Sequence, residues 1–204
     1  MSTAAFTLES AKLALPPPLA LSATLSQALQ QRRTMRAFAT RELPLPVLST
    51  LLWSAFGINR PDDGGRTAPS AHNWQEMLDY AVLPEGAYCY EPHAHELLLT
   101  RADDLRATTG MQEFVAEAPL NLVYVADFAR MPDARGDERH FFAGADAGFI
   151  AQNVYLACAA LGLATVVRGL VDRQRLAAAL GLSPAQRVSL AQSVGYPALV
   201  TAEA

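Results

Sequence analysis

The stretch Leu120–Ala126, which reads LNLVYVA, is the clearest guide to the fold of this chain. Its continuous run of apolar side chains is typical of a strand buried on both faces, at the centre of a sheet. A long helix is predicted to follow over Glu138–Leu161 and to end near Gly162, where the helical periodicity stops. A central strand followed by a long helix predicts a domain in which helices flank a sheet.

Further strands and helices are predicted on both sides of this pair. Strands are expected over residues 79–83, 87–90, 96–100, 165–167 and 187–194, and helices over residues 22–33, 47–55 and 173–180, with short ones over 103–109 and 112–116. Residues 1–21 are interpreted as an extended N-terminal arm, because a triple proline lies there, and residues 22–204 as a single domain. The predicted class is α+β (mixed α/β), with a central mixed sheet flanked by helices.

The composition indicates a compact protein without a general attraction for polyanions. Of its 204 residues 51% are hydrophobic and 18% are charged, which suits a sizeable core. The net charge of −4 argues against nucleic acid or an anionic membrane as a partner, so any anion site has to be built locally. The uncharged stretch 147–167 is interpreted as a buried helix, too short to cross a bilayer. Because the N-terminus does not resemble a signal peptide, we expect a cytoplasmic protein.

Cysteine and histidine give no metal pattern. Cys89 and Cys158 are interpreted as buried free thiols, with a disulfide between them left open. His93 and His95 alternate in a turn without an evident third ligand, so no metal is expected. Phosphate loops, dinucleotide-binding fingerprints and hydrolase elbows are absent from the sequence as well.

A cluster of arginines at the end of the first predicted helix is the first candidate site. Arg32, Arg33 and Arg36 lie within five residues of a mildly acidic chain, with Thr34 among them. The planar guanidinium suits phosphate, and Arg32 and Arg36 lie one turn apart if the helix runs on. The alternative is that these arginines are solvated and favour the negative end of the helix dipole.

The second candidate lies on the longest predicted loop, residues 59–73, and just after it. Ser70, Asn73 and Gln75 offer a hydroxyl and two amides that suit the edge of a planar heterocycle, and Trp74 suits an apolar ring. The alternative is an ordinary capped turn.

Two further segments are weaker candidates. Gly144 and Gly148 share a helix face with Gln152, and Ala147 shares a face with Ala151. Small residues spaced in this way allow another helix to approach closely. That helix could belong either to a partner subunit or to the core of the same chain. The stretch 166–172 places a glycine at the end of a strand, where backbone N–H groups can face an electron-accepting atom.

Taken together, these motifs resemble the nitroreductase family over about residues 25–197. The family's Arg-Arg-Ser/Thr-x-Arg cluster matches residues 32–36, and its Pro-Ser-x-x-Asn-x-Gln motif matches residues 69–75. Its Gln-Asn helix followed by Leu-Gly-Leu matches residues 152–163, and its closing Gly-Tyr-Pro matches residues 195–197. Residues 84–91 are also similar to a subgroup of flavin dehydrogenases that act on peptide thiazolines.

The resemblance implies non-covalently bound FMN and a homodimer with both sites at the interface. The arginines would hold the phosphate, Asn73 would contact the isoalloxazine edge with the partner's Ser70 nearby, and backbone N–H groups around Arg168 and Gly169 would face N5 and O4. The implied cofactor-binding residues are Arg32, Arg33, Thr34, Arg36, Pro69, Ser70, Ala71, Asn73, Gln75, Val167, Arg168 and Gly169.

The implied reaction is ping-pong hydride transfer from NAD(P)H through the flavin to a nitroaromatic, quinone or similar acceptor, with no side chain assigned as acid or base. A flavin dehydrogenase is disfavoured because Lys12 is the only lysine, and a flavin-binding sensor without turnover is the third hypothesis. One departure from the family is the lack of a basic residue after Pro197. Either the arginine cluster suffices, or Arg168 substitutes, or FMN affinity is reduced.

Overall fold

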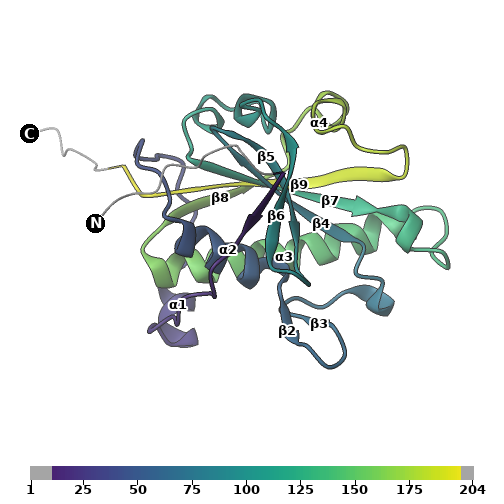
Figure 1. Ribbon diagram of the computed structural model, residues 1–204, viewed down its shortest axis with the longest axis horizontal. Helices are drawn as coiled ribbons and strands as arrows, with labels where there is room; N and C mark the ends of the chain where they lie inside the picture. Colours follow the sequence, from purple (N-terminus) through teal and green to yellow (C-terminus); the bar gives the residue numbers. More distant parts are fainter. Residues whose placement is uncertain (1–10, 199–204) are drawn as a thin grey trace, which may run out of the picture.

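The computed structural model describes residues 11–198 and confirms the α+β class. Its main feature is a seven-stranded sheet in the order β1-β6-β5-β4-β7-β9-β8 (Figure 1). Every pairing in this sheet is antiparallel, where a mixed sheet is expected from the sequence. The strands are β1 (Lys12–Ala14), β4 (Met77–Leu83), β5 (Gly86–Glu91), β6 (Glu96–Arg101), β7 (Leu120–Asp127), β8 (Ala164–Arg168) and β9 (Gln186–Gly195).

Four α-helices accompany the sheet in the described part of the chain. They are α1 (Leu25–Gln31), α2 (Leu45–Phe56), α3 (Glu138–Leu161) and α4 (Arg173–Leu180). Helices α3 and α4 have their predicted bounds, because Gly162 and Gly181 adopt the left-handed conformation that closes a helix (φ of 68° and 71°). The predicted short helices are single 3-10 turns, η2 (Arg106–Thr108) and η3 (Glu113–Val115), and η4 (Phe128–Arg130) follows β7.

Strand β7 is central, as predicted, and its two faces meet different helices. Leu122, Tyr124 and Ala126 face a core built with α2 and α3. Val123 and Val125 face a smaller core built with α4. The alternation of side chains along a strand produces this division, and both faces are dry because helices cover both. Figure 1 shows α3 running the length of the sheet below it and α4 above.

The described part of the predicted arm is packed against the domain. Residues 12–14 form β1 at the edge of the sheet, paired with β6. The carbonyl oxygen of Pro16 lies 3.1 Å from Nε2 of His95, and Leu19 N donates to the hydroxyl of Thr50 (2.8 Å). Residues 1–10 of the predicted arm lie outside the described residues.

The predicted loop 59–73 contains a small antiparallel hairpin, β2 (Ile58–Arg60) and β3 (Gly65–Arg66), and ends in η1 (Ala71–Asn73). Cys89 and Cys158 are free thiols, the first partly exposed and the second buried. Among residues 11–198 no helix is sufficiently long and apolar to span a membrane. No group of three or more His, Cys, Asp or Glu side chains in this range is placed to hold a metal ion.

Candidate functional site

The arginine cluster lies immediately beyond α1, on the surface. Arg32 is the C-terminal cap residue, with φ −53° and ψ 122°, so the helix does not continue through the cluster. The interpretation that Arg32 and Arg36 lie one helical turn apart is therefore wrong. Arg33 and Arg36 are exposed, and none of the three arginines forms an ion pair with a carboxylate within the described residues. Three surface guanidiniums are thus available to an external anion.

Tyr155 of α3, which the sequence did not single out, fixes this segment in place. Its hydroxyl lies 3.0 Å from Oγ1 of Thr34 and accepts a hydrogen bond from the backbone N–H of Val167 (3.1 Å). The guanidinium of Arg32 lies over its ring, 5.3 Å from the centroid. One buried phenol therefore ties the arginine segment to the end of β8, and two of the predicted motifs are neighbours in space.

The amides of the second motif have different roles. Gln75 is fully engaged: its Nε2 donates to Gly64 O and to Asn73 Oδ1 (both 3.1 Å), and its Oε1 accepts from Nε of Arg66 (2.9 Å). Asn73 is exposed, and its Nδ2 donates to no acceptor within residues 11–198. Gln75 therefore orients Asn73, while the amide N–H groups of Asn73 remain for a ligand.

Ser70 and Ala71 bond to two buried carboxyl groups that the sequence did not single out. The Ser70 hydroxyl donates to Oε2 of Glu76 (3.1 Å), and Ala71 N donates to Oδ2 of Asp146 (3.0 Å). Burial and the neighbouring Asp146 raise the pKa of Glu76 to about 7. No local pattern reveals this pair, because its members are 70 positions apart in the chain.

Pro69 and Trp74 are the remaining residues of the second motif that were considered as ligand contacts. Pro69 is exposed. Trp74 stacks on His72, with ring centroids 4.5 Å apart, so its indole covers a neighbouring side chain of the loop. The interpretation that Trp74 covers a ligand ring has no support in this arrangement.

The end of β8 presents one free backbone donor. Val167 N is taken by Tyr155, whereas Gly169 is exposed and its N–H has no acceptor in the described chain. Arg168 is only 3% exposed, and its guanidinium donates to Thr109 O (2.7 Å) and Asn121 Oδ1 (2.9 Å) in the interior. Desolvation lowers the pKa of Arg168 to about 10. The alternative that Arg168 substitutes for a missing phosphate ligand is therefore wrong, because its charge faces inward.

Helix α3 carries both Asp146 and Tyr155, and one of its sides is buried in the core while another is exposed. Ala147 and Ala151 are buried in the core, so for these two residues the neighbour is the core of the same chain and not a partner subunit. Gly144, Gly148 and Gln152 are exposed, and a Cβ atom added at either glycine would meet nothing within 4 Å. The bare face of α3, as we call Gly144, Gly148 and Gln152, starts two residues before Asp146 and ends three residues before Tyr155.

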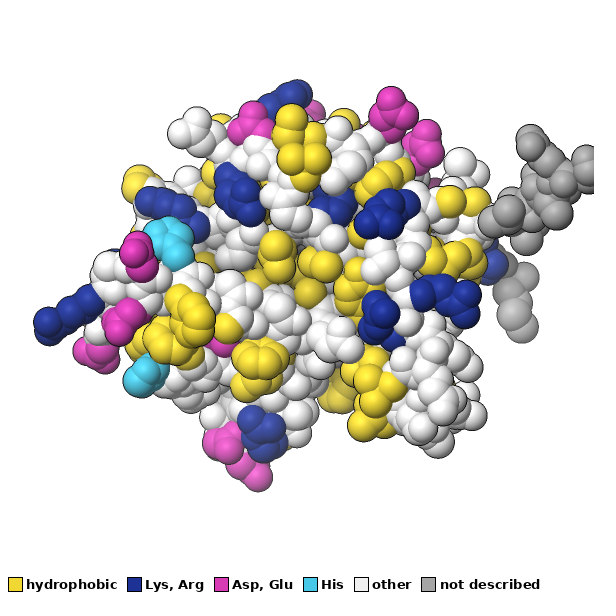
Figure 2. Space-filling model, turned by 180° about the vertical axis from the view of Figure 1, so that it is seen from behind, with side chains coloured by type: hydrophobic (Ala, Val, Ile, Leu, Met, Phe, Trp, Pro, Cys, Tyr) yellow, Lys and Arg dark blue, Asp and Glu magenta, His cyan; other side chains and the backbone are white. Residues whose placement is uncertain are grey.

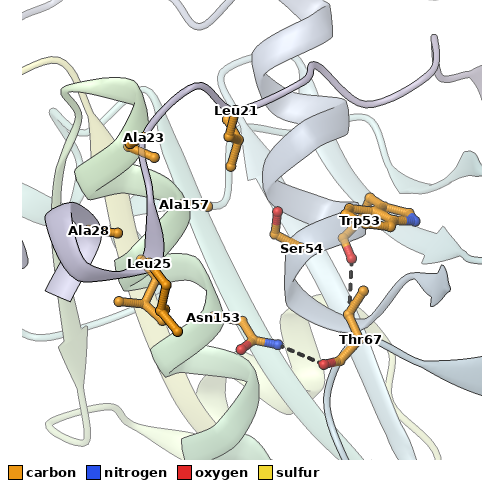
Figure 3. Close-up of a pocket in the computed structure, with 11 residues that line it drawn as sticks. Leu21, Ala23, Leu25, Ala28, Trp53, Ser54, Thr67, Asn153 and Ala157 are labelled. Atoms are coloured by element: carbon orange, nitrogen blue, oxygen red, sulfur yellow. Dashed lines mark hydrogen bonds between the residues drawn. The ribbon is translucent and has the colours of Figure 1, made fainter.

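Figure 2 shows the molecule from behind, with basic side chains spread over this face and apolar side chains over its middle and lower part. Large apolar side chains are exposed beside the bare face, with Phe141 at 70% and Phe149 at 49%. A shallow groove of about 280 Å³ lies between α1, α2 and α3 (Figure 3). Its floor is apolar, and Asn153 closes one side by donating to Thr67 O (3.3 Å). This face is unusually apolar for a surface exposed to water.

Comparison with known proteins places this arrangement in a family. The model of the nitroreductase family matches residues 29–196. A relative from Methanocaldococcus jannaschii that carries a provisional nitroreductase name is 30% identical over 155 residues, covering 71% of this chain and 78% of the relative. A crystal structure from Ralstonia eutropha, also provisionally described as a nitroreductase, is 42% identical and superimposes with a TM-score of 0.90, over 95% of this chain and 93% of the other.

A more distant structure shares the fold. The NADPH:FMN oxidoreductase of Vibrio harveyi, solved with NAD⁺, has a TM-score of 0.63 at 21% identity, over 85% of this chain and 68% of the other. The fold, the motifs and these matches agree: the chain belongs to the nitroreductase family, and it is an oxidoreductase.

Proposed function

We propose that this protein is an FMN-dependent NAD(P)H oxidoreductase that works as a homodimer and reduces a nitroaromatic, quinone or similar acceptor. The observation that carries the proposal is a line of unsatisfied groups on one side of the molecule. It runs from the unpaired arginines at the end of α1, along the bare face of α3, to the free amide of Asn73.

The residues present fit FMN at each end of this line. A phosphate monoester carries two charges and three strong acceptors, which suit Arg32, Arg33 and Arg36. The flavin ring has polar atoms along its edge, which suit the N–H groups of Asn73 and Gly169. Bare glycines between the two ends leave room for a flat ring.

Bound FMN would supply hydride transfer between the nicotinamide and the acceptor. The protein's own residues bind and orient: the arginines hold the phosphate, Gln75 fixes the amide of Asn73, and Tyr155 fixes the segment after α1. The V. harveyi protein, named as an NADPH:FMN oxidoreductase and solved with NAD⁺, supports the choice of both cofactors.

The homodimer belongs to the same proposal. A surface with Phe141 and Phe149 exposed, an apolar groove beside α1 and a glycine-lined helix face is what an interface core requires. A second copy placed there by two-fold symmetry would cover both the groove and one side of the ligand. That cover would exclude water from the flavin and complete each site with the partner chain.

The dehydrogenase hypothesis remains disfavoured. Its reaction needs a proton acceptor above the flavin, and the only lysine, Lys12, is bonded to Glu96 at the edge of the sheet (2.7 Å). The similarity of residues 84–91 to flavin dehydrogenases acting on peptide thiazolines is the observation that favours it.

The test is spectroscopic. The purified protein is expected to show flavin bands near roughly 370 and 450 nm, and anaerobic NADH or NADPH is expected to bleach the band near 450 nm. A protein that binds FMN but is bleached by neither nucleotide would be the sensor instead. A protein that neither retains nor rebinds FMN would refute the cofactor assignment.

A further inference from the structure

Arg66 of β3 is a buried cation that contacts the loop carrying Asn73. Its Nη1 donates to the carbonyl oxygen of Phe56 (3.2 Å), and its guanidinium lies over the Phe56 ring, 5.0 Å from the centroid. Its Nε donates to Oε1 of Gln75 (2.9 Å). An arginine side chain carries only N–H donors and no acceptor. Whatever Arg66 meets in the loop must therefore be an acceptor.

The side-chain amide of Gln75 is held in one orientation by its neighbours. Its Oε1 faces Arg66, and its Nε2 donates to the carbonyl oxygen of Gly64 (3.1 Å). Turning the amide over would set its NH₂ group against the guanidinium and its oxygen against that carbonyl, which breaks both hydrogen bonds at once. The backbone is fixed as well, because Arg130 of η4 donates to Gln75 O (3.0 Å) and Gln75 N donates to the Ser70 hydroxyl (2.8 Å).

The orientation of Gln75 decides that of Asn73. Nε2 of Gln75 also donates to Oδ1 of Asn73 (3.1 Å). Because this nitrogen is only a donor, the atom of Asn73 that meets it has to be the oxygen. The other end of the amide, Nδ2, donates to no acceptor within residues 11–198, and Asn73 is exposed. The contacts thus lead from a buried cation, through one amide, to an exposed donor.

We propose that Arg66 and Gln75 set the polarity of the contact at Asn73: they turn a donor toward the ligand and so select a ligand that places an acceptor there. Both are positioning residues, which act on the ligand through Asn73. The inference rests on the proposed FMN site. The pyrimidine edge of a flavin alternates carbonyl oxygens with an N–H group, so the amide of Asn73 is expected to meet a carbonyl oxygen or a ring nitrogen and not the N–H.

A donor at this place also acts on the redox balance of the bound flavin. Reduction adds negative charge to the ring, and its acceptor atoms become stronger acceptors. A donor therefore stabilises the reduced form more than the oxidised form and raises the midpoint potential of the bound flavin, whereas an acceptor at the same place lowers it. The midpoint potential is thus a measurement that depends on which end of the Asn73 amide faces the flavin.

The first test compares Asn73→Gly with Asn73→Asp by fluorescence titration of flavin-free full-length protein. Both residues tolerate the left-handed backbone of this position (φ 53°). Asn73→Asp keeps an acceptor for Gln75 but presents only acceptors outward, so it should bind FMN more weakly than Asn73→Gly and give a lower midpoint potential. Asn59→Asp adds the same charge at an exposed asparagine of β2 and should behave as wild type. Binding by Asn73→Asp as tight as that of wild type would overturn the proposal.

The second test is a double-mutant cycle. Gln75→Glu still accepts from Arg66 but turns an acceptor toward Asn73, whose amide must then donate inward and present its oxygen to the ligand. FMN should bind about tenfold more weakly, yet less than about twofold more weakly when Asn73→Gly is already present. Arg66→Met removes the donor that orients Gln75 and should show the same dependence on Asn73, which covers the case in which Gln75→Glu fails to fold. Equal weakening in both backgrounds would make these residues merely structural and overturn the proposal.

Side-chain amide exchange in flavin-free protein separates this inference from the proposed function. By NMR, the Nδ2 protons of Asn73, identified by their loss in Asn73→Gly, are expected to exchange rapidly with water in wild type and slowly in Gln75→Glu. That result in a protein that does not bind FMN would keep the polarity assignment and refute the cofactor. FMN binding with Nδ2 protons that are already protected in the flavin-free wild type would keep the cofactor and refute the polarity assignment.

Discussion

The substitution Arg36→Ala tests the phosphate assignment without disturbing the fold. Arg36 is exposed, and in residues 11–198 its side chain has neither a hydrogen bond nor an ion pair. Its removal should therefore change the free energy of unfolding of the flavin-free protein by less than about 0.5 kcal/mol. Any loss of FMN affinity then reports on the ligand.

The size of that loss follows from the charges. A hydrogen bond to a charged group contributes about 1.5–3 kcal/mol, which corresponds to a dissociation constant roughly 10- to 150-fold higher. The guanidinium of Arg168 faces the interior, so it does not substitute for a lost arginine of the cluster. The effect should therefore lie in this range and not below it.

The assay is a titration of flavin-free protein with FMN and with riboflavin, which has no phosphate. Riboflavin should bind wild type more weakly than FMN does, and Arg36→Ala should leave riboflavin binding unchanged. Arg175→Ala, which removes an exposed arginine from α4 on the opposite face of the sheet, is the matched control for net charge. Equal weakening of both ligands by Arg36→Ala would show that Arg36 is structural and that the phosphate lies elsewhere.

Three further predictions concern the loop, the interface and the core. Asn73→Gly keeps the left-handed backbone while removing the amide, so FMN should bind about 1–3 kcal/mol more weakly by titration; an unchanged affinity would leave Asn73 as a turn residue. A Cβ atom at Gly148 would meet no atom of the described chain within 4 Å, so Gly148→Leu should act on the partner: light scattering should show a shift from dimer to monomer with loss of bound flavin, and an intact dimer would place the interface elsewhere. Burial raises the pKa of Asp79 from 3.8 to about 7, so its protonated form is favoured and stability is lost as the pH rises between these values. Asp79→Asn should therefore be more stable than wild type at pH 8 by up to about 4 kcal/mol in urea unfolding, and an equal or lower stability would refute the burial argument.

The elements with strong local signals were predictable from the sequence. Helices α3 and α4 follow from periodicity and a closing glycine, and β7 from its continuous apolar run. Strand β1 and the hairpin β2–β3 were not predicted, since short strands owe their existence to partners far along the chain. The sequence did not predict that the sheet is entirely antiparallel, because apolar runs do not indicate the direction of a strand.

The motifs of the site were predictable as segments but not as contacts. Tyr155 lies inside an apolar helical stretch, and its bond to Thr34 joins residues 121 positions apart. Glu76 lies between the predicted loop 59–73 and the predicted strand 79–83, and Asp146 is an isolated acid among small residues of a predicted helix, so no local pattern indicates that the two lie near each other. The alternative that Arg168 binds the phosphate was left open because a basic residue at the end of a strand gives no sign of which way it points.

That inward arginine has a consequence for strand register. Arg168 lies on β8, the last strand of the sheet, and its guanidinium reaches Asn121 on β7, across the intervening β9. Gly110 makes room for it, since a Cβ atom there would overlap the guanidinium nitrogen of Arg168. A slip of β8 by one residue would turn the charge outward and bury Val167 in its place, leaving the amide of Asn121 without this donor. An edge strand is otherwise the easiest strand to misalign, and here the buried guanidinium of Arg168 fixes the register of β8.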